Sequence, residues 1–405
     1  MSHRRTLPAV VATVAALILA GCTVPAASTS TPSPDPSPGA APEEVFTPVL
    51  GSVLAVPEAY PATDGLVHIA YELVLSNVLS QDVTLDLVRV TDGEDTLLEL
   101  GGDALAPWVR IYGGDAGSLV MGPGQRALVW LDVTVGSMDE VPETIAHEVQ
   151  ISPETAIEPV VTSPMTELIA QTAVSSTEPI VISPPLRGEG WFDGNSCCGV
   201  TPHRAAINPI NGALHAPERY AIDYAQLNAD GRLFDGPRDE LESYAYYGAD
   251  IHAVADGPIV AMVWDLPEQT PGANPSGLSV AEYGGNHIVQ DIGGGHYAFY
   301  AHLQPDNPLG VEIGQELEAG EVIARLGNTG NTDEPHLHFH VMDSPLPLAS
   351  NGRPFVFDSF ELEGIVPDDA IDACASEPEP CDVETAEAGA REAVGPLSGD
   401  VMTYH

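Results

Sequence analysis

Apolar and polar residues alternate along several short stretches of this 405-residue chain, and this period of two limits the fold more than any other feature. Within 129–135, for example, Val and Leu alternate with Trp, Asp and Thr, and similar patterns cover 67–75 and 83–87. Successive side chains of a β-strand point to opposite faces, so the pattern is typical of strands with one buried face. The 39 glycines and 37 prolines favour frequent turns. We therefore predict an all-β protein.

The composition changes along the chain and divides it into segments. At 26–44 the sequence is mostly Ser, Thr, Pro and Ala without an apolar period, which is typical of an extended linker. Strand-like stretches separated by turn signals follow, and they predict a sandwich of two sheets. We expect a signal peptide at 1–21, a tether at 22–45, an immunoglobulin-like β-sandwich at 46–160, a linker at 161–186, a second, antiparallel β domain at 187–363 and an acidic tail at 364–405.

The N-terminus has the features of a bacterial export signal. Arg4 and Arg5 precede a mostly apolar run at 9–20, which is too short for a permanent membrane span. The sequence Leu-Ala-Gly-Cys at 19–22 resembles the lipobox that directs lipid attachment to its cysteine. We therefore expect Cys22 to be lipidated and to anchor an extracytoplasmic protein to the bacterial cell membrane. A plain secretory peptide with an incidental cysteine would give the same compartment without the anchor.

The charge balance is strongly acidic, with 13 Lys and Arg residues against 59 Asp and Glu residues and a net charge of −46. Nucleic-acid binding depends on cationic contacts to phosphates, so we expect no nucleic-acid partner. Solubility outside the cell explains the acidity. Accumulation of divalent cations at the surface is an alternative that no local cluster in the sequence supports.

Four cysteines besides Cys22 remain, and an even number in an extracytoplasmic protein suggests disulfides. They are Cys197, Cys198, Cys374 and Cys381, which allow three pairings. We favour bridges between the adjacent pair and the tail, or a local bridge from Cys374 to Cys381. A zinc-binding role for Cys197 or Cys198 is a further alternative. A disulfide would hold the beginning of the tail and leave the rest loose.

Histidines at alternate positions of 335–341 form the most informative motif of the chain. If this stretch is a strand, His336, His338 and His340 project from one face, while the apolar residues between them enter the core. Neutral imidazole is a good zinc ligand, so the row of histidines predicts a metal or catalytic site. Solvent-facing histidines on an edge strand are the structural alternative.

Two further segments supply the remaining parts of a hydrolytic zinc site. His302 lies near the end of a strand-like stretch at 297–303, where we expect it on the same side as Tyr300. Asp223 follows the apolar pair 221–222. A carboxylate and histidines can provide three protein ligands and leave the fourth zinc position for water, while an unligated imidazole nearby transfers protons.

The order and spacing of these motifs resemble the lysostaphin/LytM-type zinc peptidases, which cut peptide bridges in bacterial cell walls. The resemblance covers about 201–341. It is carried by the turn at 253–257, the Tyr-Ala-His-Leu element at 300–303, the glycine-punctuated stretch 311–330 and the Pro-His-Leu-His-Phe sequence at 335–339.

By position, the resemblance implies a LytM-type peptidase domain in which Asp223 and His338 bind Zn²⁺. It also implies that His302 and His336 are the two catalytic histidines. His340 stands where the family usually has Glu, and it would orient a zinc ligand or the attacking water.

One family position is not matched. The family has a histidine ligand four residues before the aspartate, and this chain has Arg219 there, whose guanidinium stays protonated and cannot bind Zn²⁺. His203 is the preferred replacement, because 203–212 resembles the family's first turn near the metal. His215 is the second candidate, and the absence of a third ligand is the remaining alternative. The other histidines considered are expected to be structural, namely His68, His252, His287 and His296.

The resemblance implies a cell-surface zinc metalloendopeptidase that acts on peptidoglycan peptides. A catalytically inactive LytM-like regulator or binding protein of cell-wall hydrolases is the alternative, because Arg219 is the kind of change that such relatives show. A zinc peptidase for a secreted protein is a third hypothesis. Two long loops, 230–247 and 265–285, are expected to flank the site. The acidity of the first suggests a cationic or amine-bearing ligand, or only a solvated surface.

Overall fold

The computed structural model describes residues 44–273, 275–376 and 378–405. Cys22, the expected signal peptide and nearly all of the expected tether lie outside these residues. Within them, strands dominate and the α-helices are short, α1 (Pro202–Ala205) and α2 (Asp368–Ser376). The prediction of an all-β fold is therefore confirmed. None of the described helices is long and apolar enough to cross a membrane.

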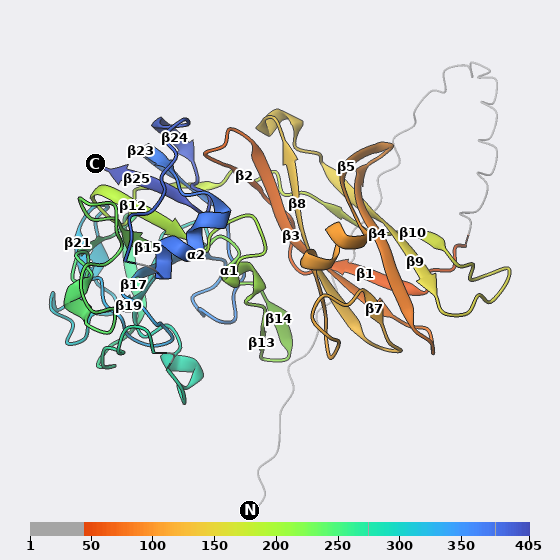
Figure 1. The fold of residues 1–405 in the computed structure, drawn as a ribbon, viewed down its shortest axis with the longest axis horizontal. Helices are drawn as coiled ribbons and strands as arrows, with labels where there is room; N and C mark the ends of the chain where they lie inside the picture. Colours follow the sequence, from red (N-terminus) through yellow and green to blue (C-terminus); the bar gives the residue numbers. More distant parts are fainter. Residues whose placement is uncertain (1–43, 274, 377) are drawn as a thin grey trace, which may run out of the picture. The chain divides into compact units, whose positions relative to one another are not determined.

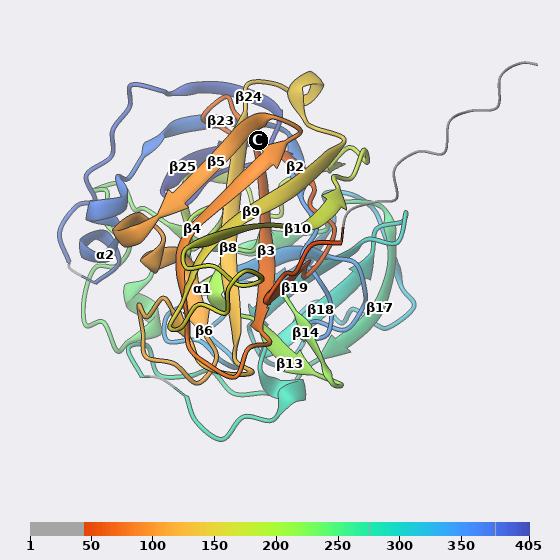
Figure 2. The same ribbon diagram turned by 90° about the vertical axis from the view of Figure 1, so that its right-hand side faces the viewer.

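The first third of the described chain forms a sandwich of two sheets (Figures 1 and 2). One sheet has the order β1-β3-β8-β6 with β2 beside β3, and the other has the order β10-β9-β4-β5 with β7 beside β4. Apolar side chains of alternate positions, such as Leu73 and Val129 from one sheet and Leu85 and Val149 from the other, share one core. The strands are β1 (Val49–Val53), β2 (Ala59–Pro61), β3 (Val67–Asn77), β4 (Val83–Asp92), β5 (Asp95–Gly101), β6 (Val109–Ile111), β7 (Val120–Met121), β8 (Arg126–Val135), β9 (Thr144–Pro153) and β10 (Met165–Ala173).

The sandwich extends beyond the expected boundary at residue 160, because β10 pairs with β9. β11 (Ile180–Ile182) then pairs in parallel with β23 (Phe355–Ile365) of the next sheet. Much of the expected linker at 161–186 therefore consists of paired strands. β10 is an edge strand in which only one of nine residues is buried, so its sequence lacks the apolar alternation that marks the other strands.

Most of the remaining strands form one large sheet that carries the second core. Its order is β11-β23-β25-β12-β15-β22-β19-β18-β17-β20, with β24 beside β23. The hairpin β13–β14 and the pair β16–β21 lie outside this sheet. The strands are β12 (Gly188–Gly194), β13 (Asn208–Ile210), β14 (Ala213–His215), β15 (Ile222–Gln226), β16 (Asp250–His252), β17 (Gly257–Val263), β18 (Asn286–Asp291), β19 (Tyr297–Leu303), β20 (Glu316–Leu317), β21 (Val322–Arg325), β22 (Leu337–Met342), β24 (Gly389–Val394) and β25 (Asp400–Tyr404).

The expectation of a loose acidic tail at 364–405 is wrong. β25 lies between β12 and β23, and β24 pairs with β23. Met402 of β25 is fully buried and faces Trp191 and Leu362 on the two neighbouring strands. The acidic stretch that precedes β25 dominates the composition of the tail. The five residues of β25 were therefore not recognised as a strand from the sequence.

Both disulfides join cysteines that are close in the sequence. Cys374 is bonded to Cys381, which was one of the favoured alternatives. Cys197 is bonded to its neighbour Cys198, so the other favoured alternative, bridges from this pair to the tail, is wrong. A zinc-binding role for either adjacent cysteine is excluded in this state, because both sulfur atoms are used in the bond.

Candidate metal centre

His338 and His340 lie on β22, which runs between β15 and β19, and His336 directly precedes this strand. The apolar residues of β22 enter the core on one face. On the other face, His336, His338 and His340 line a cavity of about 810 Å³. The face that the alternating sequence predicts for each of these residues is therefore correct. Because β22 lies between two other strands, the edge-strand alternative is wrong.

Asp223 lies on β15 in register with His338. Its Oδ1 atom is 2.9 Å from Nδ1 of His338 and 3.2 Å from Nε2 of His336. Its Oδ2 atom is 3.1 Å from Nε2 of His203 and accepts a hydrogen bond of 2.9 Å from the amide of Asn195. The carboxylate is therefore surrounded by three imidazoles, each with a ring nitrogen directed at it.

His203 reaches the site from helix α1, far from the histidine row in the sequence. Its Nδ1–H donates to the Ala221 carbonyl at 3.0 Å, which leaves Nε2 facing Asp223. One ligand atom from each of His203, Asp223 and His338 can be chosen so that all lie within 4.8 Å of one another. Two imidazoles and a carboxylate are a donor set that suits Zn²⁺ and leaves an open position, so the residues present fit this metal.

His340 contacts the candidate ligand His338 from behind. The two rings meet through Nε2 of His338 and Nδ1 of His340 at 2.9 Å. Burial and the neighbouring His338 hold the pKa of His340 well below its ordinary value, so His340 is neutral and can accept the Nε2 proton of His338. With that proton placed on Nε2, the Nδ1 atom of His338 is available to a metal.

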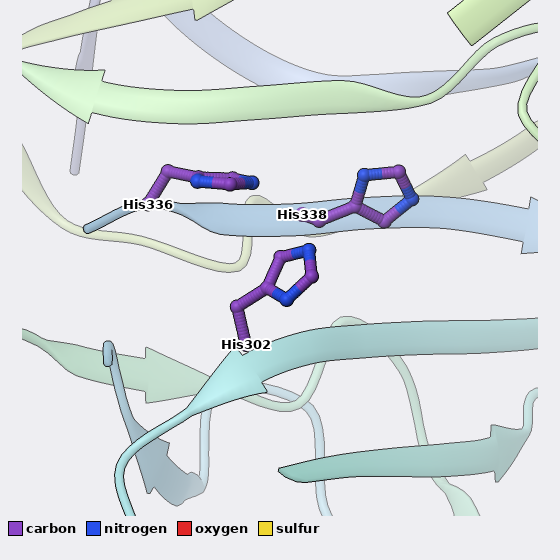
Figure 3. A group of neighbouring side chains, drawn as sticks. All are labelled: His302, His336 and His338. Atoms are coloured by element: carbon purple, nitrogen blue, oxygen red, sulfur yellow. The ribbon is translucent and has the colours of Figure 1, made fainter. Parts of the chain in front are cut away.

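His302 points from β19 toward the histidines of β22 (Figure 3), and its ring centroid is 4.7 Å from that of His336. The expectation that His302 shares a side with Tyr300 is wrong. Tyr300 is buried in the core, where its hydroxyl bonds Gln290, whereas His302 lines the cavity. The φ angle of His302 is 61°, and this left-handed conformation breaks the alternation of the strand. Its Nδ1–H donates to the Thr329 carbonyl at 2.7 Å.

The charges divide the histidines of the site into two kinds. Burial, together with His336 and His338, holds the pKa of His302 well below its ordinary value. Burial also acts against protonation of His203 and His336, but Asp223 outweighs it and raises the pKa of both, that of His203 to about 9. Burial likewise opposes ionisation of Asp223, yet His203 and His336 hold its pKa well below the ordinary range. The site thus contains two neutral histidines, His302 and His340, beside a charged network.

Two residues of the expected metal region lie elsewhere. Arg219 is buried and forms hydrogen bonds with the carboxylate of Glu72 on β3. His215 lies in the hairpin β13–β14, and it belongs to none of the potential metal-binding groups in the described part of the chain.

The cavity also contains residues that the sequence did not reveal. Asn195 follows β12 and had no motif to mark it, and His287, which was expected to be structural, lines the cavity while its Nδ1–H donates to the Gly285 carbonyl. The loop 265–285 contributes to the wall, as expected, through residues such as Tyr283. The loop 230–247 does not line this cavity.

Comparisons with known proteins cover the part of this site that lies after residue 240. Residues 241–354, which include His302, His336 and His338, match the sequence model of Peptidase family M23. Glycyl-glycine endopeptidase ALE-1 of Staphylococcus capitis is 31% identical over 118 residues, which are 29% of this chain and 28% of that protein. Peptidoglycan DD-endopeptidase ShyA of Vibrio cholerae is 28% identical in an alignment of 160 residues that covers 31% of this chain and 36% of that protein.

This chain therefore spans only 28% and 36% of the lengths of these two relatives. Among solved structures, the catalytic domain of lysostaphin from Staphylococcus simulans aligns with 23% identity and a TM-score of 0.22, over 41% of this chain and 88% of that one. The sequence match across 241–354 identifies the family: the chain contains a domain of peptidase family M23.

Proposed function

We propose that this protein is a zinc metalloendopeptidase that hydrolyses peptide bonds of peptidoglycan. The observation that carries the proposal is the group of His203, Asp223 and His338, whose ligand atoms lie within 4.8 Å of one another beside a cavity. Three protein ligands of this kind are typical of catalytic zinc, which keeps a fourth position open. The substrate class is supported by the relatives, which are named as a glycyl-glycine endopeptidase and a peptidoglycan endopeptidase.

In this proposal each side chain of the site has a distinct task. His203, Asp223 and His338 would hold zinc, which when bound supplies Lewis acidity and lowers the pKa of a water molecule. His302 is neutral and donates Nδ1–H to the Thr329 carbonyl, so its unprotonated Nε2 can accept a proton. The Nδ1–H of His336 donates to the Glu334 carbonyl at 2.8 Å, and its Nε2 atom lies beside the candidate ligand Asp223, where a proton on Nε2 would stabilise a developing oxyanion.

The location is part of the same proposal. We propose that Cys22 is lipidated and that the protein is anchored to the bacterial cell membrane on its extracytoplasmic side. The two disulfides support this location, because such bonds persist in oxidising compartments. A membrane-anchored enzyme at this surface has direct access to an insoluble cell-wall substrate.

The alternative is a regulator of cell-wall hydrolases that has lost its own activity. Arg219 favours it, because the family's histidine ligand is missing at that position. The 3.1 Å distance between His203 and Asp223 favours the enzyme, because a site that had lost its activity would not need a replacement ligand.

Metal analysis and substrate digestion test the proposal together. The wild-type protein should bind about one Zn²⁺ per chain and release amines from purified sacculi. His203→Ala and His338→Ala should lose both the metal and the activity, because each removes a ligand. His302→Ala should keep the zinc and lose amine release. His215→Ala is the matched control and should behave as wild type. A folded wild-type protein that binds no zinc would establish the regulator instead, and full zinc retention in His203→Ala would remove His203 from the ligand set.

A further inference from the structure

Helix α1, which carries His203, consists of a single turn. A helix this short gains little stability from its own hydrogen bonds, so its position depends on its surroundings. Two side chains of the sandwich form hydrogen bonds with this helix. The indole N–H of Trp130 on β8 donates to the Arg204 carbonyl at 2.8 Å, and the guanidinium of Arg110 donates to the Ala205 carbonyl at 3.1 Å.

The side chain of Arg204 extends this contact into the sandwich. It is fully buried, and its guanidinium donates at 3.2 Å to the carbonyls of Tyr71 on β3 and Leu131 on β8. It also donates to the Cys198 carbonyl, which closes the loop that leads into α1. A rigid guanidinium with several backbone partners fixes the residue that carries it. Because Arg204 follows His203 directly, the same contacts fix the candidate ligand.

Glu72 of β3 connects this region with the strand that carries Asp223. Its carboxylate pairs with Arg219 and lies 3.6 Å from the guanidinium of Arg204. Glu72 is completely buried and Arg219 is nearly so. Charges buried in this way are tolerated only in well-defined geometry, and breaking one partner leaves the others uncompensated. One carboxylate thus holds both the segment before Asp223 and the helix of His203.

We infer that the sandwich is a positioning element of the metal centre. Glu72 and Trp130 hold α1 so that His203 reaches Asp223, and the set of three ligands is complete only with the sandwich in place. The inference rests on the proposed zinc site. It assigns a task to the sandwich, and it explains Arg219, which occupies the position of the missing ligand and anchors the domain that positions the replacement.

Zinc titration of two variants of the full chain tests the inference. Trp130→Phe keeps an aromatic ring and removes only the N–H donor, and it should weaken zinc binding about 10-fold, as loss of a contact that orients a ligand does. Glu72→Gln keeps the shape and removes the charge, and it should weaken zinc binding about 100-fold. Affinities are measured by competition with a chelator at a temperature where both variants are folded.

Arg353→Gln is the matched control. It breaks another ion pair to the sandwich, 2.8 Å long, between Arg353 and Glu58, which touches neither α1 nor Asp223. Its zinc affinity should equal that of wild type even if its melting temperature falls. Hydrogen exchange of the zinc-free proteins should be faster at the amides of 203–206 in Trp130→Phe and unchanged there in Arg353→Gln.

The outcomes separate the two proposals. If wild type binds no zinc, the proposed function fails. If wild type binds zinc and both Trp130→Phe and Glu72→Gln bind it equally well, the positioning role is wrong. Equal weakening in Arg353→Gln would also overturn it, because the effect would then follow from loss of stability in general.

Discussion

His340 accepts the Nε2 proton of His338, and its own Nε2 atom is buried without a hydrogen-bond partner in the described structure. The resemblance implies a glutamate at this position, which would accept the same proton and add a negative charge beside Asp223. A neutral imidazole orients His338 without that charge. Asp223 therefore remains the only carboxylate in the candidate ligand set. At the scale of single residues, the metal affinity of the site should therefore depend on His340, the hydrogen-bond partner of His338, as well as on the candidate ligands themselves.

His340→Ala should lower zinc affinity by about 10- to 100-fold, because the Nε2–H of His338 loses its acceptor and the ring is no longer held. His340→Glu should restore most of the affinity, since a carboxylate accepts the same hydrogen bond. Competition with a chelator measures both effects. His252→Ala removes a histidine that bonds the Gly320 carbonyl outside the site, and it should bind zinc as wild type does. Wild-type affinity in His340→Ala would show that the contact does not orient His338.

Two loops hold β19 where it presents His302. The backbone N–H of His302 donates to the Gly284 carbonyl at 3.1 Å, and its ring donates to the Thr329 carbonyl. Gly285 lies against the same carbonyl, so that a Cβ atom there would come within 2.1 Å of the Thr329 oxygen. Glycine at this position therefore allows the loops to touch and to support the left-handed conformation of His302.

Gly285→Ala should reduce amine release from sacculi at least about 10-fold while zinc remains bound, because the displaced Thr329 carbonyl no longer orients His302. Gly293→Ala is the matched control, since Gly293 also has a positive φ of 82° but has open space around a Cβ atom. It should cost about 1 kcal/mol of stability and leave activity near that of wild type. Equal losses of activity in the two variants would mean that backbone strain alone is responsible.

Individual elements differ in how far the sequence could predict them. The histidine face of β22 follows from the alternation, because each residue type records which side is buried. The orientation of His302 could not be predicted in this way, because its φ of 61° interrupts the strand and a pattern of period two does not show such a change. His203 could be preferred only by its likeness to a family turn, because α1 is held by Trp130 and Glu72, residues far away in the sequence. β25 was missed because its few apolar residues follow a long acidic stretch.

The sandwich also brings a charged histidine close to the segment that leads to the metal centre. His68 on β3 lies between Asp132 at 2.9 Å and Asp64 at 3.1 Å. Its imidazole, Asp132 and Cys198 each have an atom within 4.8 Å of the others. Burial acts against protonation of His68, but the two aspartates outweigh it and raise its pKa to about 9. At the scale of the whole molecule, the contact between sandwich and loop therefore includes a protonated imidazole at neutral pH.

The stability of the whole molecule should depend on this group. Because the folded pKa of His68 is above its unfolded value of about 6.5, the stabilisation is complete below that pH and is lost as the pH rises through about 9. His68→Asn should be less stable than wild type by up to about 3 kcal/mol near pH 6, and the difference should vanish above about pH 10. Urea unfolding at several pH values measures it, and a difference that does not change with pH would contradict the assignment.

The position of β25 in the sheet has a consequence for the order in which the sheet can form. β12 and β23 are both hydrogen-bonded to β25, yet they come from distant parts of the sequence and precede it. Until Asp400–Tyr404 has joined the sheet, the edges of β12 and β23 that face β25 are therefore unpaired, and such edges are prone to aggregate. β12 also borders β15, which carries Asp223. We therefore expect that the sheet next to Asp223 is protected at both edges of β12 only when β25 is in place.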